Sequence, residues 1–422
     1  MSVLRLIKDK YLKIFLALMI GIIVGFIALF YNYILDFFTS LFIDPVQELT
    51  IYNRLSFIFL PAIGGLIVGL IVKYGSMTAK GHGIPAILTS IKTKERHLTY
   101  RDLLTEGFAS AVTIATGGAG GRIGPIVEIG AGIGDLIAYK LKLDLFDYQT
   151  FLGCGAAAGI AGLFHAPLGG IMFVIEILFE KIEKNRLILV SISAIAAEMV
   201  IRWSGRDYFL KDLVLIEVGG FYNFVLAILI GIAASISAII FIYSLKFISD
   251  LFDNLKINII FKPALGGLLL GFIAFKLPQI MGSGTRIVFS LFSQTSFSLS
   301  FLFLLLIFKI IATALTLGSG GSGGIFSPSL LLGSLTGIII GNLFYQFLPI
   351  GQNNPALYAL IGMAAVISGV IRAPLTATFI ILEFTHNYNL MLFLLIATLI
   401  SDQLVSFSGL KSVYSPDYFE RL

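Results

Sequence analysis

The residues with the clearest capacity for chemistry lie in a glycine-rich stretch that runs from Gly117 to Glu128, between two long apolar segments. Glycine allows backbone amides to approach a ligand closely, and Pro125 suits the first turn of a helix, where its missing N–H costs nothing. The first amides of such a helix have no intrahelical partner and carry the positive end of its dipole. The stretch predicts an anion site at a helix start, with a glycine-rich packing seam as the alternative.

The same pattern occurs twice in the chain. Residues 120–125 (GGRIGP) match residues 323–328 (GGIFSP), and residues 61–66 (PAIGGL) match residues 263–268 (PALGGL). Further matches pair Gly155, Pro167 and Glu176 with Gly362, Pro374 and Glu383. Blocks that recur in one order indicate a duplicated chain, and interrupted apolar segments at corresponding places in two halves indicate a binding site near the middle of a membrane. We expect a first half-repeat over residues 1–205, which begins with a cytoplasmic helix, and a second over residues 206–422.

Composition places the chain in a membrane. Of its 422 residues 57% are hydrophobic and 13% are charged, with a mean hydropathy of +0.97. A water-soluble surface needs more charge than this, and the long continuous apolar segments favour helices over a barrel. The single cysteine and four histidines form no metal motif, so we expect no metal, cofactor or enzyme activity. The net charge of +5 comes with cationic segments before the first span and between later ones, which favours a cytoplasmic N-terminus rather than a nucleic-acid partner.

The apolar segments predict a series of helices, several of them too short to cross a bilayer. The backbone between the short ones must be buried in protein or line a cavity. The predicted helices cover residues 14–35, 54–74, 84–91, 102–116, 123–139, 151–164, 168–179, 187–203, 221–247, 263–277, 299–317, 325–344, 356–371, 375–385 and 391–407.

Four sequence blocks resemble the signature blocks of the CLC family of chloride channels and anion/proton antiporters, in the order in which the family has them. They are residues 81–85 (GHGIP), 121–125 (GRIGP) and 324–328 (GIFSP), followed by Tyr414. The resemblance covers about residues 14–414. It implies an all-α polytopic membrane protein with two inverted half-repeats and broken, re-entrant helices. It also implies a homodimer in the lipid bilayer, with one pore in each subunit and dimer surfaces near residues 168–203 and 375–407.

The resemblance also assigns the site. An anion would be held near the middle of the membrane by helix N-termini, by the Tyr414 hydroxyl and by the side chain of the first block. The implied anion-binding positions are His82, Gly83, Arg122, Ile123, Gly124, Ile325, Phe326 and Tyr414.

Two departures from the family concern protons. The family's gating glutamate is replaced by Ile123, and the internal proton-loading position falls on Ile177. Neither isoleucine titrates, so we expect anions to pass without coupled protons. Two carboxylates are candidate relays: Glu176, if it lies one position off, and Glu128, five residues after Ile123. For Glu128 the spacing favours hydrogen bonding or dimer packing over a displaced gate, and for Glu383 we expect a structural cap or pair.

A third departure is His82, which stands where the family has serine. A neutral imidazole would donate one hydrogen bond as serine does. The sharper hypothesis is that His82 protonates between about pH 5 and 8 and changes anion conductance.

These observations predict a passive chloride channel or uncoupled uniporter, homodimeric, in a bacterial inner membrane. The alternatives are a proton-coupled antiporter with relocated carboxylates, a channel for another anion such as fluoride or nitrate, and a non-transporting scaffold.

Overall fold

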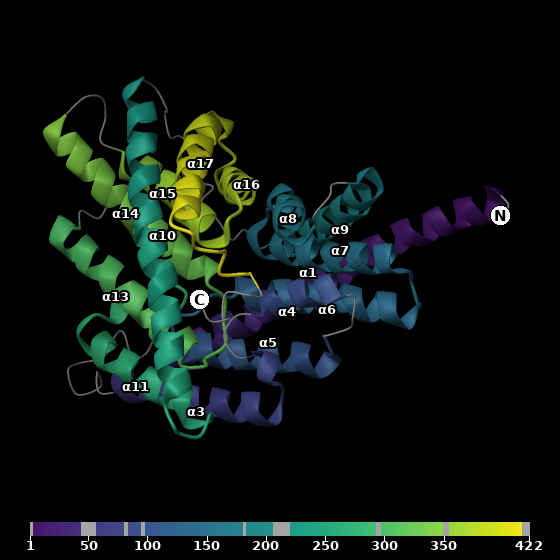
Figure 1. Cartoon of the computed structure of the whole chain (residues 1–422), viewed down its shortest axis with the longest axis horizontal. Helices are drawn as coiled ribbons and strands as arrows, with labels where there is room; N and C mark the ends of the chain where they lie inside the picture. The colour runs from purple at the N-terminus through teal and green to yellow at the C-terminus, as the bar shows by residue number, and fades with distance from the viewer. Residues whose placement is uncertain are drawn as a thin grey trace.

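The computed structural model describes residues 3–43, 56–79, 83–93, 98–179, 183–205, 220–292, 297–348 and 354–415. Within these ranges the chain is almost entirely helical, and long helices alternate with short ones that stop inside the molecule (Figure 1). Every helix predicted from the apolar segments is present, and most ends lie within a few residues of the prediction. The first helix covers Val3–Phe42 instead of residues 14–35, the helix predicted over residues 221–247 continues to Asn254, and a short helix at Thr285–Phe292 was not predicted. The boundary expected between residues 205 and 206 falls at the edge of a described range and stays a prediction.

The first half holds the N-terminal helices, in this order: α1 (Val3–Phe42), α3 (Ser56–Tyr74), η2 (Met77–Ala79), α4 (Ile84–Thr93), α5 (Tyr100–Ala115), α6 (Ile123–Lys140), α7 (Leu145–Phe164), α8 (Pro167–Phe173), the π-helical turn η3 (Val174–Leu178) and α9 (Lys184–Trp203).

The second half repeats the order with α10 (Tyr222–Asn254), α11 (Phe261–Lys276), η5 (Pro278–Ile280), α12 (Thr285–Phe292), α13 (Leu299–Gly318), α14 (Phe326–Phe347), α15 (Pro355–Ile371), α16 (Pro374–Thr385), η6 (Tyr388–Leu390) and α17 (Met391–Phe407).

The two halves pack with matching contacts, which their shared glycines make possible. A Cβ built on Gly65 of α3 would lie 2.2 Å from the Pro263 carbonyl oxygen, and one on Gly267 of α11 would lie 2.1 Å from the Pro61 oxygen. The repeated block recognised in the sequence is therefore where α3 and α11 cross, and the crossing admits no side chain. The reciprocity of these contacts is that of two inverted halves.

Each half also has its own glycine-lined crossing. A Cβ at Gly155 of α7 would lie 1.8 Å from the Gly130 carbonyl oxygen of α6, and one at Gly362 of α15 would lie 2.1 Å from the Gly333 oxygen of α14. These close crossings pack α6 against α7 and α14 against α15, and α6 and α14 are the two helices that follow the repeated glycine stretches (Figure 1).

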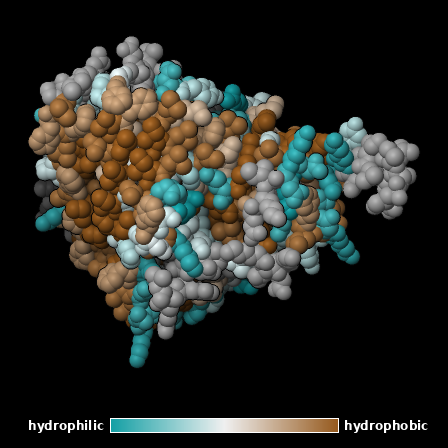
Figure 2. Space-filling view, turned by 45° about the horizontal axis from the view of Figure 1, so that its top comes forward, coloured by the Kyte–Doolittle hydropathy of each residue, from teal (hydrophilic) through white to brown (hydrophobic). Residues whose placement is uncertain are grey.

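The surface is apolar over a broad area, as a bilayer requires. Figure 2 shows hydrophobic side chains spread over the side where Figure 1 places α10, α13 and α14. Among the described residues five helical segments are long and apolar enough to cross a membrane. They are Lys10–Phe42, Tyr222–Asn254, Leu299–Gly318, Phe326–Phe347 and Tyr388–Phe407. The chain is a multi-pass membrane protein.

We predict that Gly155→Ala destabilises the fold, because its methyl group would overlap the Gly130 carbonyl at the α6–α7 crossing. Overpacking of this kind costs about 1–3 kcal/mol. The matched control is Gly107→Ala on α5, whose methyl would meet only the end of the Ile129 side chain, at 3.3 Å. Thermal unfolding in detergent should show a lower melting temperature for Gly155→Ala only. Equal melting temperatures would contradict the tight crossing.

Candidate functional site: helix starts at the centre of the fold

The two glycine-rich stretches meet each other in the structure. The Gly121 N–H donates to the Gly324 carbonyl oxygen at 2.7 Å, and the Gly324 N–H donates to the Gly121 oxygen at 2.6 Å. A Cβ at Gly124 would lie only 3.0 Å from the Gly324 Cα, so the approach depends on glycine. Because of this pairing, α6 and α14 begin beside each other although their residues are far apart in sequence.

Within the described chain, neither of these helix starts is capped by the side chain of the residue before it. The residues before them, Arg122 for α6 and Ile325 for α14, make no side-chain capping hydrogen bond. Four other helices of the described chain are capped by a polar residue at this position, namely α5 by Thr99, α7 by Asp144, α13 by Ser298 and α15 by Asn354. Four further helices, α9, α10, α11 and α17, also lack such a bond, but their first residues are not buried. The helices α6 and α14 begin at buried residues, so their first amides are available to a ligand inside the protein.

The predicted anion-binding residues at these starts are buried. Ile123 has 2% of its surface exposed, Ile325 none and Phe326 1%, and the Phe326 ring lies 5.3 Å from the ring of Phe164 at the end of α7. Free amides in such surroundings attract an anion by the helix dipole and without a full countercharge, which favours weak and reversible binding.

Arg122 lies beside the start of α6 and is tied to α1. Its Nη1 donates to Asn32 Oδ1 at 3.0 Å and lies 3.8 Å from Asp36 Oδ1. These contacts with α1 hold the guanidinium group beside the start of α6, where it adds positive charge.

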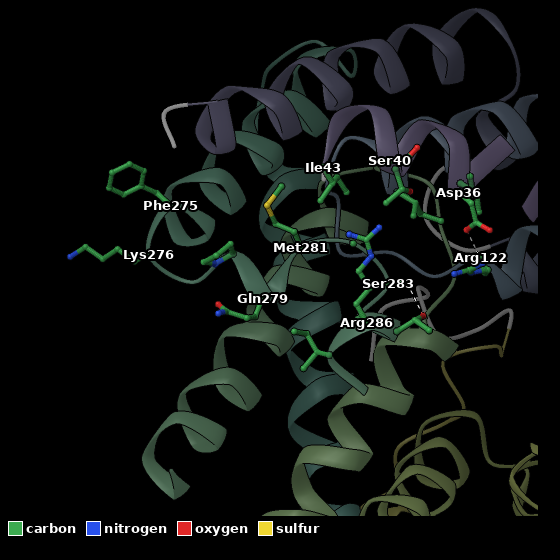
Figure 3. A pocket seen from close by; sticks show the side chains of 18 residues that line it. Asp36, Ser40, Ile43, Arg122, Phe275, Lys276, Gln279, Met281, Ser283 and Arg286 are labelled. Carbon is green, nitrogen blue, oxygen red and sulfur yellow. Dashed lines mark hydrogen bonds and ion pairs between the residues drawn. The ribbon is translucent and has the colours of Figure 1, made fainter. Parts of the chain in front are cut away.

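A cavity of about 720 Å³ opens beside Arg122 (Figure 3). Its polar wall holds Asp36 and Arg122 from the first half and Lys276 and Arg286 from the second. A smaller cavity of about 220 Å³ shares Asp36, Arg122 and Arg286 with it and reaches Ser327 in the first turn of α14. Together the two cavities connect a wall with net positive charge to the two uncapped helix starts.

Tyr414 is buried near the end of the described chain. The segment before it is held by α15, since the Val413 N–H donates to the Val370 oxygen at 3.3 Å and Ser412 Oγ donates to the Ile371 oxygen at 2.8 Å. The Tyr414 ring stands edge-on to the Phe173 ring of α8, with centroids 6.2 Å apart. A contact between its hydroxyl and an anion at the α14 start stays a prediction.

Two glutamates form a reciprocal pair of clamps between the halves. Glu176 accepts hydrogen bonds from the Leu375 and Thr376 N–H groups at the start of α16, at 2.9 and 2.6 Å, and Glu383 accepts from Leu168 and Gly169 at the start of α8, at 3.0 and 2.8 Å. The expected structural pairing of Glu383 is confirmed. For Glu176 the same geometry favours a structural cap over a proton relay.

Of two other positions that the sequence linked to protons, the structure describes Ile177 but not His82. Ile177 is half-buried in the π-helical turn η3, directly after Glu176. His82 lies outside the described residues, so the hypotheses about it stay predictions. Gly83, the next residue, lies against the Glu128 side chain.

Glu128 differs from the sequence-based interpretation. It is fully buried inside the protomer, so the expected role in dimer packing is wrong. Both carboxyl oxygens are buried without a hydrogen-bond partner in the described chain, which also argues against a structural hydrogen bond. The orientation depends on the α4–α6 contact, which helical spacing within α6 does not reveal.

Sequence reasoning missed several polar residues that the structure places near the site. Asn32 and Asp36 are one helical turn apart within an apolar segment, and Glu106 and Lys309 are buried charges on α5 and α13. Lys309 Nζ donates to the Ile280 and Gly282 carbonyl oxygens at 2.8 and 2.7 Å. A polar or ionisable residue inside an apolar helical segment was the available signal for all of them.

The fold and this centre define a class: a helical membrane protein of two inverted halves, whose glycine-rich helix starts meet in its core. The profile of the voltage gated chloride channel family matches residues 64–406, most of the chain. The chain therefore belongs to the CLC family of anion channels and transporters.

Relatives and solved structures agree with this placement. An uncharacterized protein of Methanocaldococcus jannaschii is 34% identical over 372 residues (87% of each chain), and a putative ClcB-like chloride channel protein of Ralstonia nicotianae is 28% identical over 365 residues (85% of this chain and 84% of that one). A slow cyanobacterial Cl⁻/H⁺ antiporter has a TM-score of 0.86 at 23% identity, covering 95% of this chain and 96% of its own. A CLC-type fluoride/proton antiporter has a TM-score of 0.84 at 22% identity, covering 99% of both chains. At such identities these two structures show the fold.

We predict that Glu176→Ala lowers stability by about 1–3 kcal/mol, because it leaves two backbone N–H groups at the α16 start without partners inside the membrane. The same substitution at Glu183, an exposed residue before α9 that makes no capping bond, is the control. Thermal unfolding in detergent measures both. A melting temperature of Glu176→Ala equal to that of the control would refute the clamp.

Proposed function

We propose that this protein conducts chloride passively across the membrane, as a channel or an uncoupled uniporter. The observation that carries the proposal is the pair of uncapped helix starts that meet at Gly121 and Gly324. The chain fills two other internal helix starts, those of α8 and α16, with the carboxylates of Glu383 and Glu176. The α6 and α14 starts have amides of the same kind without such a carboxylate in the part of the chain that the structure describes, and an exchangeable anion suits them.

The route to these starts runs through the cavity beside Arg122. Cations at Arg122, Lys276 and Arg286 raise the local concentration of anions at its wall, and Asp36 moderates that field. The smaller cavity continues to Ser327 on α14. An anion would then be handed from the amides at residues 122–124 to those of Ile325 and Phe326, with Tyr414 and His82 as further ligands.

Two side chains favour transport without coupled protons. Ile123 occupies the gate position and Ile177 the internal proton-loading position, and neither accepts a proton. Glu176, the neighbour of Ile177, is engaged at the α16 start. Conduction down the gradient is the mode that remains to such a pore. We also propose a homodimer in a bacterial inner membrane, with the N-terminus in the cytoplasm.

The second candidate is a proton-coupled antiporter, for chloride or for fluoride. It is favoured by the solved neighbours, one a Cl⁻/H⁺ and one a fluoride/proton antiporter, and by the buried carboxylates Glu106 and Glu128.

The two candidates predict different proton movement in liposomes. We expect purified protein, reconstituted with a chloride gradient and with potassium and valinomycin to set the voltage, to release chloride without stoichiometric proton movement. External chloride and pH are recorded together, and protein-free liposomes are the control. Protons driven uphill by the chloride gradient would replace the passive conductor by the antiporter.

A carboxylate placed at the gate position should restore a block. We predict that Ile123→Glu lowers chloride flux near neutral pH by roughly two- to thirtyfold, because a helix start favours a carboxylate by about 0.3–2 kcal/mol. Flux should recover in acid, when the carboxyl group takes up a proton. Ile123→Gln, similar in size and uncharged, separates charge from bulk. If Glu and Gln give the same pH profile, Ile123 does not lie at the gate.

A further inference from the structure

Two carboxyl groups are buried in the first half without the partners that buried charges need. Both oxygens of Glu128 on α6 lack a hydrogen-bond partner in the described chain. On α5, Glu106 Oε2 accepts from Ser322 Oγ at 3.0 Å, while its Oε1 has no partner there. Both residues are fully buried. An ionised carboxylate in such a place is costly, so the pair is adapted to hold a proton.

Glu128 is aimed at the start of α4. A Cβ built on Gly83, the residue before α4, would lie 1.2 Å from Glu128 Oε2, so the carboxyl group fits only because residue 83 is glycine. A carboxylate at this place competes with an anion for the positive end of the α4 dipole.

Glu128 is not held at the α4 start by hydrogen bonds from the residues that the structure describes, unlike the clamp residues Glu176 and Glu383 at their helix starts. Glu176 and Glu383 each accept two backbone N–H bonds of 2.6 to 3.0 Å from the helix starts that they fill. Glu128 has no such bond in the described chain. These bonds hold the Glu176 and Glu383 carboxyl groups in place, whereas the Glu128 carboxyl group has no such restraint in the described chain.

The described charges that act on Glu128 are both negative. They are Glu106 and Asp102, on α5. The acid Asp147 on α7 is paired with Lys13 of α1 at 2.6 Å, and Lys309 of α13 is bound to backbone carbonyls.

Two further titratable residues, Lys80 and His82, precede Gly83 in the sequence and lie outside the described residues. Neighbouring carboxylates cannot all be ionised at close range in a low dielectric, so proton uptake by Glu128 and by Glu106 is linked.

We propose that Glu128, with Glu106 behind it, is a proton-binding site that regulates anion passage at the start of α4. The inference rests on the proposed function, because it places the α4 start on the anion route. With Glu128 ionised, its carboxylate occupies the α4 start and repels anions; with Glu128 protonated, the start is open to them. The proton comes from water and returns to it, and nothing else is consumed.

The test is chloride flux in liposomes across about pH 4 to 9, the range that buried carboxyl groups span. We expect wild-type flux to rise in acid by roughly two- to thirtyfold. Glu128→Gln should give the high flux at every pH. Glu106→Gln removes a neighbouring negative charge and should move the midpoint to lower pH. Glu383→Gln, at the distant α8 clamp, is the matched control and should keep the wild-type profile.

The outcomes separate cleanly. A pH-independent wild-type flux, or a Glu128→Gln profile like that of the wild type, overturns the proposal while passive conduction stands. A profile flattened by His82→Ser and not by Glu128→Gln assigns the titration to His82 and overturns it as well. If Glu128→Gln does not fold, an unchanged midpoint in Glu106→Gln overturns it.

An independent readout covers the failure of the proposed function itself. Infrared difference spectra of the full protein between acid and alkaline pH should contain a carboxylic C=O band that Glu128→Gln removes and Glu383→Gln keeps. That result keeps the proton site even if chloride flux is absent or is coupled to protons. A spectrum in which Glu128→Gln removes no such band overturns the site.

Discussion

The structure depends on one constraint: a helix that starts inside a membrane exposes backbone amides that no water satisfies. The first turns of α8 and α16 solve this with carboxylates from the opposite half, and each solution mirrors the other. Among the described residues, no carboxylate fills the first turns of α6 and α14 in this way. The fold thus satisfies some internal helix starts with its own carboxylates, and under the proposed function it leaves others to a mobile anion.

Glycine allows the uncapped helix starts to approach each other closely. The pairing of Gly121 with Gly324 brings two positive helix ends together, which is unfavourable by itself and becomes favourable when an anion lies between them. Similar glycine contacts at the α3–α11 crossing and within each half hold the helices rigidly enough to keep those ends in place. The backbone geometry therefore creates the demand for an anion before any side chain contributes.

Much of this was predictable from the sequence, because it rests on local patterns. The duplication, the helices, their breaks and the two glycine-rich starts all follow from glycine, proline and apolar spacing. The partners of Glu176 were not predictable, since Thr376 lies 200 residues away and the clamp exists only once the halves are packed. For Glu128, the five-residue spacing from Ile123 indicated which side of α6 it lies on, while α4 decides what it meets there.

The two halves match in backbone structure and differ in the charge of their buried residues, so the two ends of the pore are not equivalent. Glu106 and Lys309 lie equally far before Gly121 and Gly324, both are buried, and they carry opposite charges. Lys309 donates hydrogen bonds to the carbonyl oxygens of Ile280 and Gly282, and these bonds fix the loop before α12. Glu106 stands instead beside another acid, in surroundings that resist a second negative charge. A duplicated pore with equal halves would treat its two ends alike, whereas this exchange of a buried acid for a buried base makes the two ends electrostatically different.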